Sequence, residues 1–478
     1  MTVANSAQME GFLYDRVSRH VMGLVESGTL KPGDRAPSLR QLSQQLKVSI
    51  TTVKQAYVAL EDQGVLSVRP QSGFYVNNRV EQAPQVQLRS TTSFKPRKVR
   101  FGELFEEIFQ IANDPNIVPL GAAVPSVDLM PVKGLIRATN RAASRLAESV
   151  LDYCFPPGNA ELRRQIARQY LQLGMSVSPD DVIVTSGATE ALHLCLQAVT
   201  RRGDIIAVES PTYFSVLRLI ERMGLLAVEI DTDPETGMRL DALENVLETM
   251  DVKAILSVPN FNNPTGALMP EENKRRLAEL IAEHNIPLIE DDVYGELYFD
   301  EQRPPVIKKF DTNGLVLTCS SFSKTLAPGY RIGWVLAGRY RDEVLEWKQA
   351  TTSAVASLTQ QAVSDYLRSG EYERHLVRMR KAFREQVEKM RFTVAHHFPE
   401  GTRMTNPRGG FVLWVEMPRG VDCLDVFNRA LEAGISITPG IIFSATRRYR
   451  NFIRISCGHS WSAEIEQAVK KLGEIVAA

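Results

Sequence analysis

Long apolar runs, paired cysteines and net charge are all missing from this chain of 478 residues. No apolar run reaches the roughly 18 residues that a membrane-spanning helix needs, so we expect no membrane contact. The first residues lack the basic-then-apolar pattern of a secretory signal, which predicts a cytoplasmic protein. The five cysteines are scattered and show no C-x-x-C spacing. Reduced thiols are therefore favoured over a disulfide framework or a zinc site, and no bound metal is expected.

The formal net charge of zero hides two parts of opposite charge. Residues 1–100 contain 14 Lys and Arg against 7 Asp and Glu, whereas the remainder contains 42 against 49. The basic charge of residues 1–100 indicates that this part binds a polyanion. A chance distribution of surface charge would give the same counts. The length exceeds one ordinary core and predicts two or three domains.

Residues 1–76 predict three helices followed by a hairpin. Apolar residues recur at helical spacing through the first 60 residues, and "VLSVRPQSGFYV" then gives two β-rich runs around a turn. Ser38 and Ser49 stand where N-cap residues of the second and third helices belong. Three helices and a hairpin make a winged helix-turn-helix, which is a DNA-binding fold.

The third helix is the one expected to read double-stranded DNA. Its apolar residues turn inward, so its polar side chains remain available for base edges and phosphates. The candidate DNA-binding residues are Arg40, Ser49, Thr51, Thr52, Lys54 and, in the wing, Arg69. For three helices alone, a helical bundle with solvated charges is an equally good reading.

The stretch "LKPGDRAPSLRQLSQQLKVSITTVKQAYVALEDQGVLSVRPQSGFYV" resembles the GntR-type winged helix almost end to end. One position departs from that family's common pattern, because Ile50 stands where arginine usually follows the serine. Isoleucine cannot bridge guanine O6 and N7 as arginine does. We therefore expect an operator different from those of relatives, or a lower affinity.

Residues 77–100 are polar and basic without a sustained period, which predicts a linker. Fully extended, it would span about 80 Å at ~3.3 Å per residue, enough to reach a partner subunit. Residues 101–478 then alternate short apolar strands with helices, which predicts an α/β domain with a mainly parallel sheet. From about residue 350 the pattern favours a smaller α+β subdomain, over about 350–478.

Lys324 lies between hydroxyl residues in "SSFSKTLAPGYRIGW" and has the setting of a catalytic lysine. A lysine that bonds a carbonyl cofactor points first to pyridoxal 5'-phosphate. Asp291 ends a predicted strand and could hold the proton of the pyridine nitrogen. Asn263 and Tyr294 could donate to the ring oxygen, and Tyr213 could stack on the ring.

A phosphate cradle is expected next to this lysine. "TSGATEAL" is a strand, a turn of small residues and a helix, and backbone amides at a helix N-terminus bind phosphate. The candidate phosphate-binding residues are Gly187, Ala188, Thr189, Ser321, Ser323 and Arg331. Each of the residues proposed for the ring or the phosphate has, taken alone, an ordinary structural explanation. Together, in order at strand ends, they predict a site for pyridoxal 5'-phosphate.

Residues 116–478 resemble fold-type I aminotransferases that depend on pyridoxal 5'-phosphate, in "ESPTYF", "NNPTG", "EDDVYGELYF", "SSFSK" and "FIRIS" among other stretches. The resemblance implies that Lys324 is the cofactor-bound lysine. It implies that Tyr153 reaches the phosphate bound by the neighbouring subunit of a homodimer. Arg454, with Asn263, would bind the carboxylate of an amino acid. Ala123 stands where many relatives have glycine, which would narrow the amino-acid pocket.

The combination of head, linker and body resembles the MocR (GabR-like) subfamily of GntR-type bacterial transcriptional regulators. That resemblance implies a head-to-tail, domain-swapped homodimer on operator DNA, within the bacterial cytoplasm and nucleoid. It also implies an aminotransferase-like domain that senses pyridoxal 5'-phosphate, an amino-compound effector, or both. Two alternatives remain open at this point: an aminotransferase that also binds DNA, and a sensor of pyridoxal 5'-phosphate itself.

Overall fold

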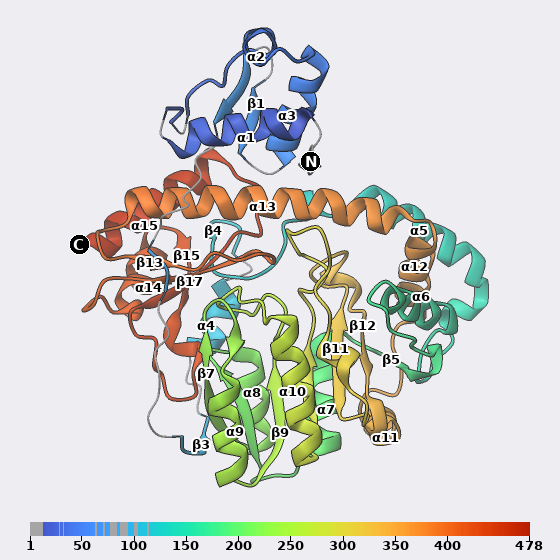
Figure 1. Ribbon diagram of the computed structural model, residues 1–478. Helices are drawn as coiled ribbons and strands as arrows, with labels where there is room; N and C mark the ends of the chain where they lie inside the picture. Colours follow the sequence, from blue (N-terminus) through green and yellow to red (C-terminus); the bar gives the residue numbers. More distant parts are fainter. Residues whose placement is uncertain are drawn as a thin grey trace, which may run out of the picture. The chain divides into compact units, whose positions relative to one another are not determined.

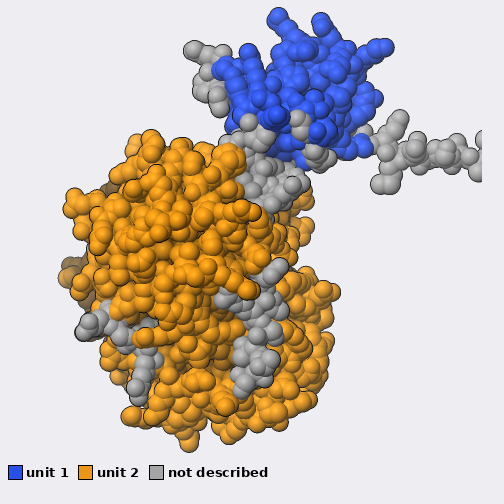
Figure 2. All heavy atoms as spheres, turned by 90° about the vertical axis from the view of Figure 1, so that its left-hand side faces the viewer, with its two compact units in different colours: residues 1–82 blue, residues 83–478 orange. Residues whose placement is uncertain are grey.

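The computed structural model describes residues 13–27, 29–31, 33–62, 65–69, 72–76, 84–86, 94–99, 104–111 and 114–478. Contacts divide the chain into two compact units, residues 1–82 and 83–478 (Figure 2). Within the described residues, no helix combines the length and the apolar character that crossing a bilayer requires.

The first unit contains three helices and a two-stranded hairpin. The helices are α1 (Leu13–Glu26), α2 (Leu39–Leu46) and α3 (Ile50–Asp62), and the hairpin strands are β1 (Leu66–Arg69) and β2 (Gly73–Val76). The two strands pair antiparallel (Figure 1). This order of elements confirms the predicted winged helix-turn-helix.

Two serines begin the helices of the helix-turn-helix pair. The side chain of Ser38 accepts a hydrogen bond from the backbone N–H of Gln41, and Ser49 Oγ accepts one from Thr52 N–H at 3.0 Å. Each serine thus satisfies an amide that the helix leaves open. Buried apolar residues fill the space between the helices: Val17, Val21, Leu42, Val53, Ala56, Tyr57 and Leu60. The predicted inward face of α3 is therefore confirmed.

The second unit is built on one large sheet. In spatial order its strands are β3 (Arg97–Lys98), β7 (Leu226–Asp233), β6 (Ile205–Ser210), β9 (Val252–Ser257), β10 (Leu288–Asp291), β11 (Val316–Ser321), β12 (Gly333–Leu336) and β5 (Val182–Thr185), and β8 (Gly237–Met238) pairs with β7. The run from β7 to β11 is parallel, whereas β3, β12 and β5 pair antiparallel with their neighbours. The mainly parallel α/β sheet predicted from the sequence is confirmed.

Helices cover both faces of this sheet, as continuous apolar strands require. Ile206 and Val208 belong to a core shared with α7 (Ala188–Val199) and α8 (Phe214–Met223). Ala207, between them, belongs to the opposite core with α9 (Leu240–Thr249) and α10 (Glu271–His284). Successive residues of one strand therefore face different helix layers.

Further helices precede the smaller C-terminal part or pack on the large sheet. They are α4 (Leu104–Ile111), α5 (Val132–Leu146), α6 (Ala160–Leu171), α11 (Arg341–Thr351) and α12 (Ser357–Arg368). Short 3-10 turns lie at Val127–Leu129, Ala147–Leu151, Pro179–Asp181, Ile307–Phe310, Pro328–Tyr330, Gly338–Tyr340 and Gly440–Phe443. Buried residues of α5, α6 and α12 share one core with β12 and β5. Thus α12, although it follows residue 350, packs with the large sheet.

A smaller α+β part follows along the chain. Its antiparallel sheet has the order β13 (Arg403–Met404), β14 (Val412–Glu416), β17 (Phe452–Ser456) and β16 (Thr438–Pro439), with helices α13 (Glu371–His397), α14 (Cys423–Glu432) and α15 (Ala463–Ala477). Figure 1 shows α13 running from α15 towards α5 and α12. A separate pair joins β15 (Ile435–Ser436) to β4 (Val118–Pro119) in parallel. Residues near 120 therefore belong with the C-terminal part of the fold.

Two described segments of the expected linker pack on the second unit. Pro84 O accepts a hydrogen bond from Met404 N, and β3 pairs with β7 at the edge of the large sheet. Val86 and Val99 are buried. Single apolar residues in a polar stretch give no period, so the sequence pattern showed no such contacts. The other residues of the expected linker lie outside the described residues.

Candidate functional site

Lys324 lies in the turn after β11. Phe322 and Leu326 are buried on either side of it and hold the turn, with Leu326 N–H donating to Phe322 O at 2.9 Å. Lys324 Nζ donates to Ala123 O at 2.7 Å and lies 6.0 Å from the centre of the Tyr294 ring. The amine therefore points from the end of the large sheet towards the segment near residue 120.

The surroundings of Lys324 favour its neutral amine. Desolvation lowers the pKa of Lys324 to about 8, and the charge of Arg454 adds to this, while Asp291 opposes it. A neutral amine is the form that attacks a carbonyl group. Near neutral pH a useful fraction of Lys324 is thus in the reactive form.

Asp291 is the last residue of β10 and is 4% exposed. Burial raises the pKa of its carboxyl to about 7, while a hydrogen bond from Val293 N–H and the charge of Lys324 act in the opposite direction. A buried carboxyl of this kind gains a partner when a protonated ring nitrogen is placed against it.

A chain of hydrogen bonds links three of the predicted residues. Asn263 Nδ2 donates to the Tyr294 hydroxyl at 3.3 Å, and Arg454 Nη1 donates to Asn263 Oδ1 at 3.0 Å. Arg454 Nη2 donates to Thr438 Oγ1 at 2.9 Å and to Gly121 O. Arg454 is 1% exposed, and its Nε–H has no hydrogen-bond partner among the described residues. An unsatisfied buried guanidinium N–H suits an anionic ligand.

The N-terminus of α7 lies against the side chain of Arg331. Gly187 caps the helix with φ 84°, and Arg331 Nη2 donates to Ser186 O at 2.9 Å. A Cβ at Gly187 would overlap the guanidinium of Arg331, and a Cβ at Gly333 would lie 2.6 Å from the carbonyl carbon of Gly187. Arg331 Nη1 also lies 3.4 Å from Ser323 Oγ. The guanidinium and the open helix amides therefore face the same small space.

The remaining cradle residues lie beside this contact. Ala188 and Thr189 begin α7, and among the described residues no side chain caps that helix. Ser321 Oγ accepts from Ser323 N–H at 3.3 Å. Free amides at a helix start, with an arginine beside them, fit a phosphate group.

Tyr213 precedes α8, and its ring is half-buried. Burial raises the pKa of its phenol, and the charges of Arg454, Asp291 and Arg331 all act on it. Tyr213 therefore lies in the same electrostatic environment as the predicted ring-binding residues.

Tyr153 is not brought to this site within the chain. It is 76% exposed and stacks on Phe155, with ring centres 5.4 Å apart.

The candidate DNA-binding residues lie in the first unit. Arg40, Ser49, Thr51 and Lys54 are exposed. Thr52 is half-buried, and its Oγ1 lies 2.8 Å from Ser49 Oγ, so these two hydroxyls are engaged with each other. The side chain of Arg69 lies outside the described residues.

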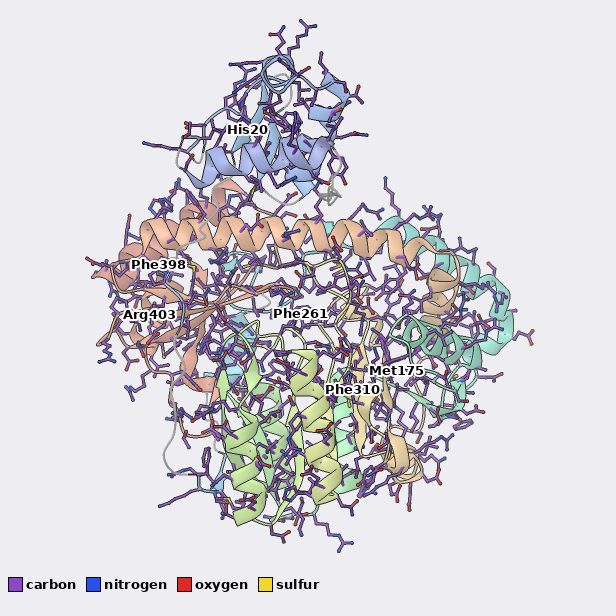
Figure 3. The ribbon with its side chains drawn as sticks, viewed as in Figure 1. His20, Met175, Phe261, Phe310, Phe398 and Arg403 are labelled. Carbon is purple, nitrogen blue, oxygen red and sulfur yellow. The ribbon has the colours of Figure 1, made fainter. Side chains whose placement is uncertain are left out.

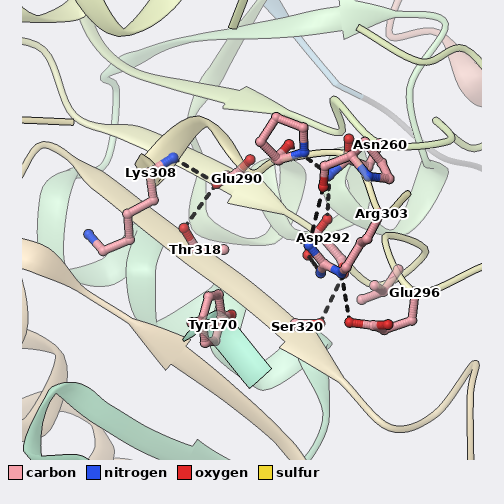
Figure 4. A network of polar contacts seen from close by, with 12 residues as sticks. Tyr170, Asn260, Glu290, Asp292, Glu296, Arg303, Lys308, Thr318 and Ser320 are labelled. Atoms are coloured by element: carbon pink, nitrogen blue, oxygen red, sulfur yellow. Dashed lines mark hydrogen bonds and ion pairs between the residues drawn. The ribbon is translucent and has the colours of Figure 1, made fainter. Parts of the chain in front are cut away.

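A buried charged network includes Glu290 and Asp292, the two chain neighbours of Asp291 (Figure 4). Asp292 Oδ2 accepts from Arg303 Nη2 at 2.5 Å, and Arg303 Nε donates to Glu296 Oε1 at 2.6 Å. Glu290 accepts from Thr318 Oγ1 at 2.9 Å. The run "EDD" could have signalled this network, because residues two apart on a strand face the same side, which groups Glu290 with Asp292. Only the middle acid, Asp291, was predicted as a site residue.

Family models match both units. The model for aminotransferase class I and II matches residues 115–472, and the model for bacterial regulatory proteins of the gntR family matches residues 13–76. Class I and II aminotransferases depend on pyridoxal 5'-phosphate, so the match implies this cofactor.

Relatives and solved structures agree with these matches. The HTH-type transcriptional regulator YjiR of Escherichia coli is 39% identical, over 97% of this chain and 98% of its own. YdcR, a second such regulator of Escherichia coli, is 37% identical over the same shares. Among structures, the α-aminoadipate aminotransferase LysN of Thermus thermophilus, in complex with N-(5'-phosphopyridoxyl)-L-leucine, superposes with a TM-score of 0.74 at 28% identity. The superposition covers 80% of this chain and 95% of LysN.

The regulators match nearly the whole chain, whereas the aminotransferase match is confined to the second unit. The chain therefore belongs to the aminotransferase class I and II family and carries a GntR-family helix-turn-helix domain, which is the architecture of the MocR-like transcriptional regulators.

Proposed function

We propose that this protein is a DNA-binding transcriptional regulator that holds pyridoxal 5'-phosphate at Lys324 and responds to an amino compound. The observation that carries the proposal is the convergence of Lys324, Asp291, Asn263, Tyr294 and Arg454 in a chain that also has a winged helix-turn-helix. The response then requires that the effector bind two arrangements of the protein with different affinity.

Each part of the cofactor has residues that suit it. Lys324 would bind it covalently, Asp291 would hold the proton of the ring nitrogen, and Asn263 with Tyr294 would hydrogen-bond the ring oxygen. The phosphate would lie against Gly187, Ala188, Thr189, Ser321, Ser323 and Arg331, and Tyr213 would stack on the ring. When bound, the cofactor supplies an electron-withdrawing ring for chemistry at an amino group.

Arg454 suits the carboxylate of an amino-acid effector. Its guanidinium is already oriented by Asn263 and Thr438, so little ordering is lost when a ligand binds. Burial lowers its pKa to about 10, which leaves it charged at neutral pH. A carboxylate would satisfy the Nε–H that now has no partner among the described residues.

Removal of Arg454 should separate effector binding from cofactor binding. In the Arg454→Ala variant, we expect an amino acid that binds the wild type to bind about 100-fold more weakly, because a charged hydrogen bond is lost. Pyridoxal 5'-phosphate should still load, with unchanged visible absorbance. The measurement is a spectral titration of the loaded protein with amino acids. Unchanged amino-acid affinity in the variant would refute this role.

Apolar side chains exposed on the second unit support a homodimer. Several lie between residues 124 and 155: Val124, Val127, Val132, Ile136, Leu151, Tyr153 and Phe155. Leu151 is 87% exposed. A concentration of exposed apolar residues marks a protein interface. We infer that a second copy covers this face, in a head-to-tail, domain-swapped dimer where Tyr153 reaches the partner's cofactor phosphate.

DNA binding should depend on the exposed cations of the helix-turn-helix. We expect Arg40→Ala and Lys54→Ala each to weaken binding to a mixed-sequence duplex, and to reduce the salt dependence by about one counterion. Visible absorbance with pyridoxal 5'-phosphate should not change. Arg19→Ala, which removes an exposed cation from α1, is the matched control. Equal losses in all three variants would contradict the assignment of the reading face.

One observation favours a second function, aminotransferase activity. Lys324 has a lowered pKa, which suits it to move a proton between Cα of a substrate and C4′ of the cofactor. Nothing in regulation requires this turnover, so the two functions can be measured separately.

One experiment tests the proposal against both alternatives. The full-length protein is loaded with pyridoxal 5'-phosphate, and its DNA affinity is measured with a panel of amino acids, beside a transamination assay with 2-oxo acids. A change in DNA affinity caused by an amino acid supports the proposal. Sustained turnover without any change in DNA affinity would replace it by the aminotransferase. A response to pyridoxal 5'-phosphate alone would identify a cofactor sensor.

A further inference from the structure

Glu209 is a buried acid in the second unit to which none of the roles above has been given. It lies on β6 and is fully buried, and four residues separate it from the start of α8. Its carboxyl accepts three hydrogen bonds, from Ser257 Oγ at 2.8 Å, Val258 N–H at 3.0 Å and Asn262 Nδ2 at 2.6 Å. A buried carboxyl that accepts three hydrogen bonds fixes the positions of the groups that donate them.

The three partners of Glu209 are not equivalent. Val258 N–H and Asn262 Nδ2 are donors only, and both meet the same oxygen, Oε2. The other oxygen meets the Ser257 hydroxyl, which is able either to donate or to accept. Oε2 must therefore be an acceptor whatever the protonation state of the carboxyl. A glutamine could make the same hydrogen bonds. Its side-chain carbonyl would accept from Val258 N–H and Asn262 Nδ2, and its amide would donate to Ser257 Oγ.

Asn262 is the centre of the turn that follows. Its Oδ1 accepts from Thr265 N–H at 3.4 Å and Thr265 Oγ1 at 3.1 Å, while its backbone N–H donates to Ala267 O at 3.0 Å. The side chain is thus held at both ends, by Glu209 on one side and by Thr265 on the other. Losing Glu209 would release one end.

The next residue is Asn263, which bridges Tyr294 and Arg454. Phe261, on the other side of Asn262, is fully buried with φ 57° and lies near the middle of the second unit (Figure 3). A Cβ at Gly409 would lie 2.5 Å from the Phe261 ring. Close packing therefore limits where the turn can go, and Glu209 sets the orientation of its central amide.

We infer that Glu209 is a positioning residue, which through Asn262 holds Asn263 where it can donate to the ring oxygen of pyridoxal 5'-phosphate. The inference rests on the proposed function, because it concerns how the chain's own residues meet that cofactor. Glu209 itself touches neither the ring nor the effector. Its effect is therefore confined to the ligand group that Asn263 contacts.

Because only the ring oxygen should be affected, two ligands that differ in that oxygen test the inference. Dissociation constants of the full-length protein are measured for pyridoxal 5'-phosphate and for the analogue that lacks the ring hydroxyl. In Glu209→Ala, affinity for pyridoxal 5'-phosphate should fall about tenfold, as is typical when a supporting residue behind a ligand-contacting residue is lost. Affinity for the analogue should stay within a factor of about two, because the analogue has no ring oxygen for Asn263 to meet. Glu209→Gln should restore the wild-type values for both ligands.

Ser257→Ala is the matched control, since it removes a bond to Glu209 without touching the turn, and it should leave both affinities unchanged. Should Glu209→Ala fail to fold, Asn262→Ala removes the same bond from the other side, together with the two bonds from Thr265, and should show a selective loss at least as large. Equal losses for both ligands, or no loss in a folded variant, would overturn the inference. A wild type that takes up neither ligand would instead overturn the proposed function.

Discussion

Replacement of Lys324 by alanine should abolish the visible absorbance that the protein acquires with pyridoxal 5'-phosphate. That absorbance belongs to the covalent bond between a lysine amine and the cofactor. Two other buried lysines are engaged elsewhere. Lys274 Nζ donates to Asn260 Oδ1 at 2.6 Å, and Lys348 Nζ donates to Glu190 Oε1 at 2.8 Å. Neither amine is available to replace Lys324.

The measurement is absorbance after dialysis, combined with borohydride reduction and mass spectrometry of the peptides. In the wild type the reduced cofactor should be found on the peptide that contains Lys324. In Lys324→Ala no peptide should carry it, although free cofactor is expected to bind about tenfold or more weakly through its phosphate. Lys253→Ala, at an exposed lysine of β9, is the control. Retained absorbance in Lys324→Ala would refute the assignment.

The Asp291→Asn variant should bind the cofactor poorly yet be the more stable protein without it. Asparagine cannot hold a proton on the ring nitrogen, so affinity for pyridoxal 5'-phosphate should fall about 100-fold. Without cofactor, the wild type bears the cost of a buried carboxylate, which asparagine of the same shape does not. Sites built for a ligand often carry this kind of stability cost.

The pH dependence of that stability follows from the pKa of Asp291. Burial raises it from 3.8 to about 7, so the folded protein keeps a proton that the unfolded chain releases. The contribution of Asp291 to the free energy of unfolding therefore falls as pH rises from about 4 to about 7, by on the order of 4 kcal/mol, and then stays level. Asp291→Asn lacks this fall. Its melting temperature should exceed that of the wild type by several degrees at pH 8, with no difference near pH 4.

The neighbouring residue supplies a matched contrast. Asp292→Asn makes the same chemical change, but it breaks the buried ion pair with Arg303. Removing one partner of a buried pair typically costs about 3–5 kcal/mol, so this variant should melt well below the wild type at pH 8. Both variants are measured by thermal unfolding of protein freed of cofactor. If Asp291→Asn also melts lower at pH 8, the stability argument fails.

Local sequence signals predicted much of the fold. Helical spacing and the cap positions Ser38 and Ser49 predicted the three helices, and the resemblance to the GntR-type winged helix decided for a helix-turn-helix. Short apolar runs between helices were enough for the parallel sheet. The pairing of β4 with β15 was not foreseen, because it joins segments more than 300 residues apart. Neither was the docking of the linker stretch at β3, where two paired residues leave no periodic signal.

The residues proposed to contact the cofactor could be picked out in the sequence, because they follow predicted strands in motifs that resemble those of aminotransferases. The residues that hydrogen-bond and orient these residues could not be picked out in the sequence. Thr438 reaches Arg454 only because β16 and β17 pair with these two residues opposite each other. That register is a property of the folded sheet. In the chain, Thr438 is an ordinary threonine and Glu209 an ordinary acid.

The contact between Gly187 and Gly333 limits how far this chain can diverge. Gly187 has a left-handed φ and lies against Arg331, and a side chain at Gly333 would run into the backbone of Gly187. A side chain at Gly187 displaces the guanidinium of Arg331, and one at Gly333 displaces the start of the helix. Natural variants can therefore be sorted without an assay. In copies that lack either glycine, we expect the proposed phosphate-binding site at the start of α7 to be disrupted.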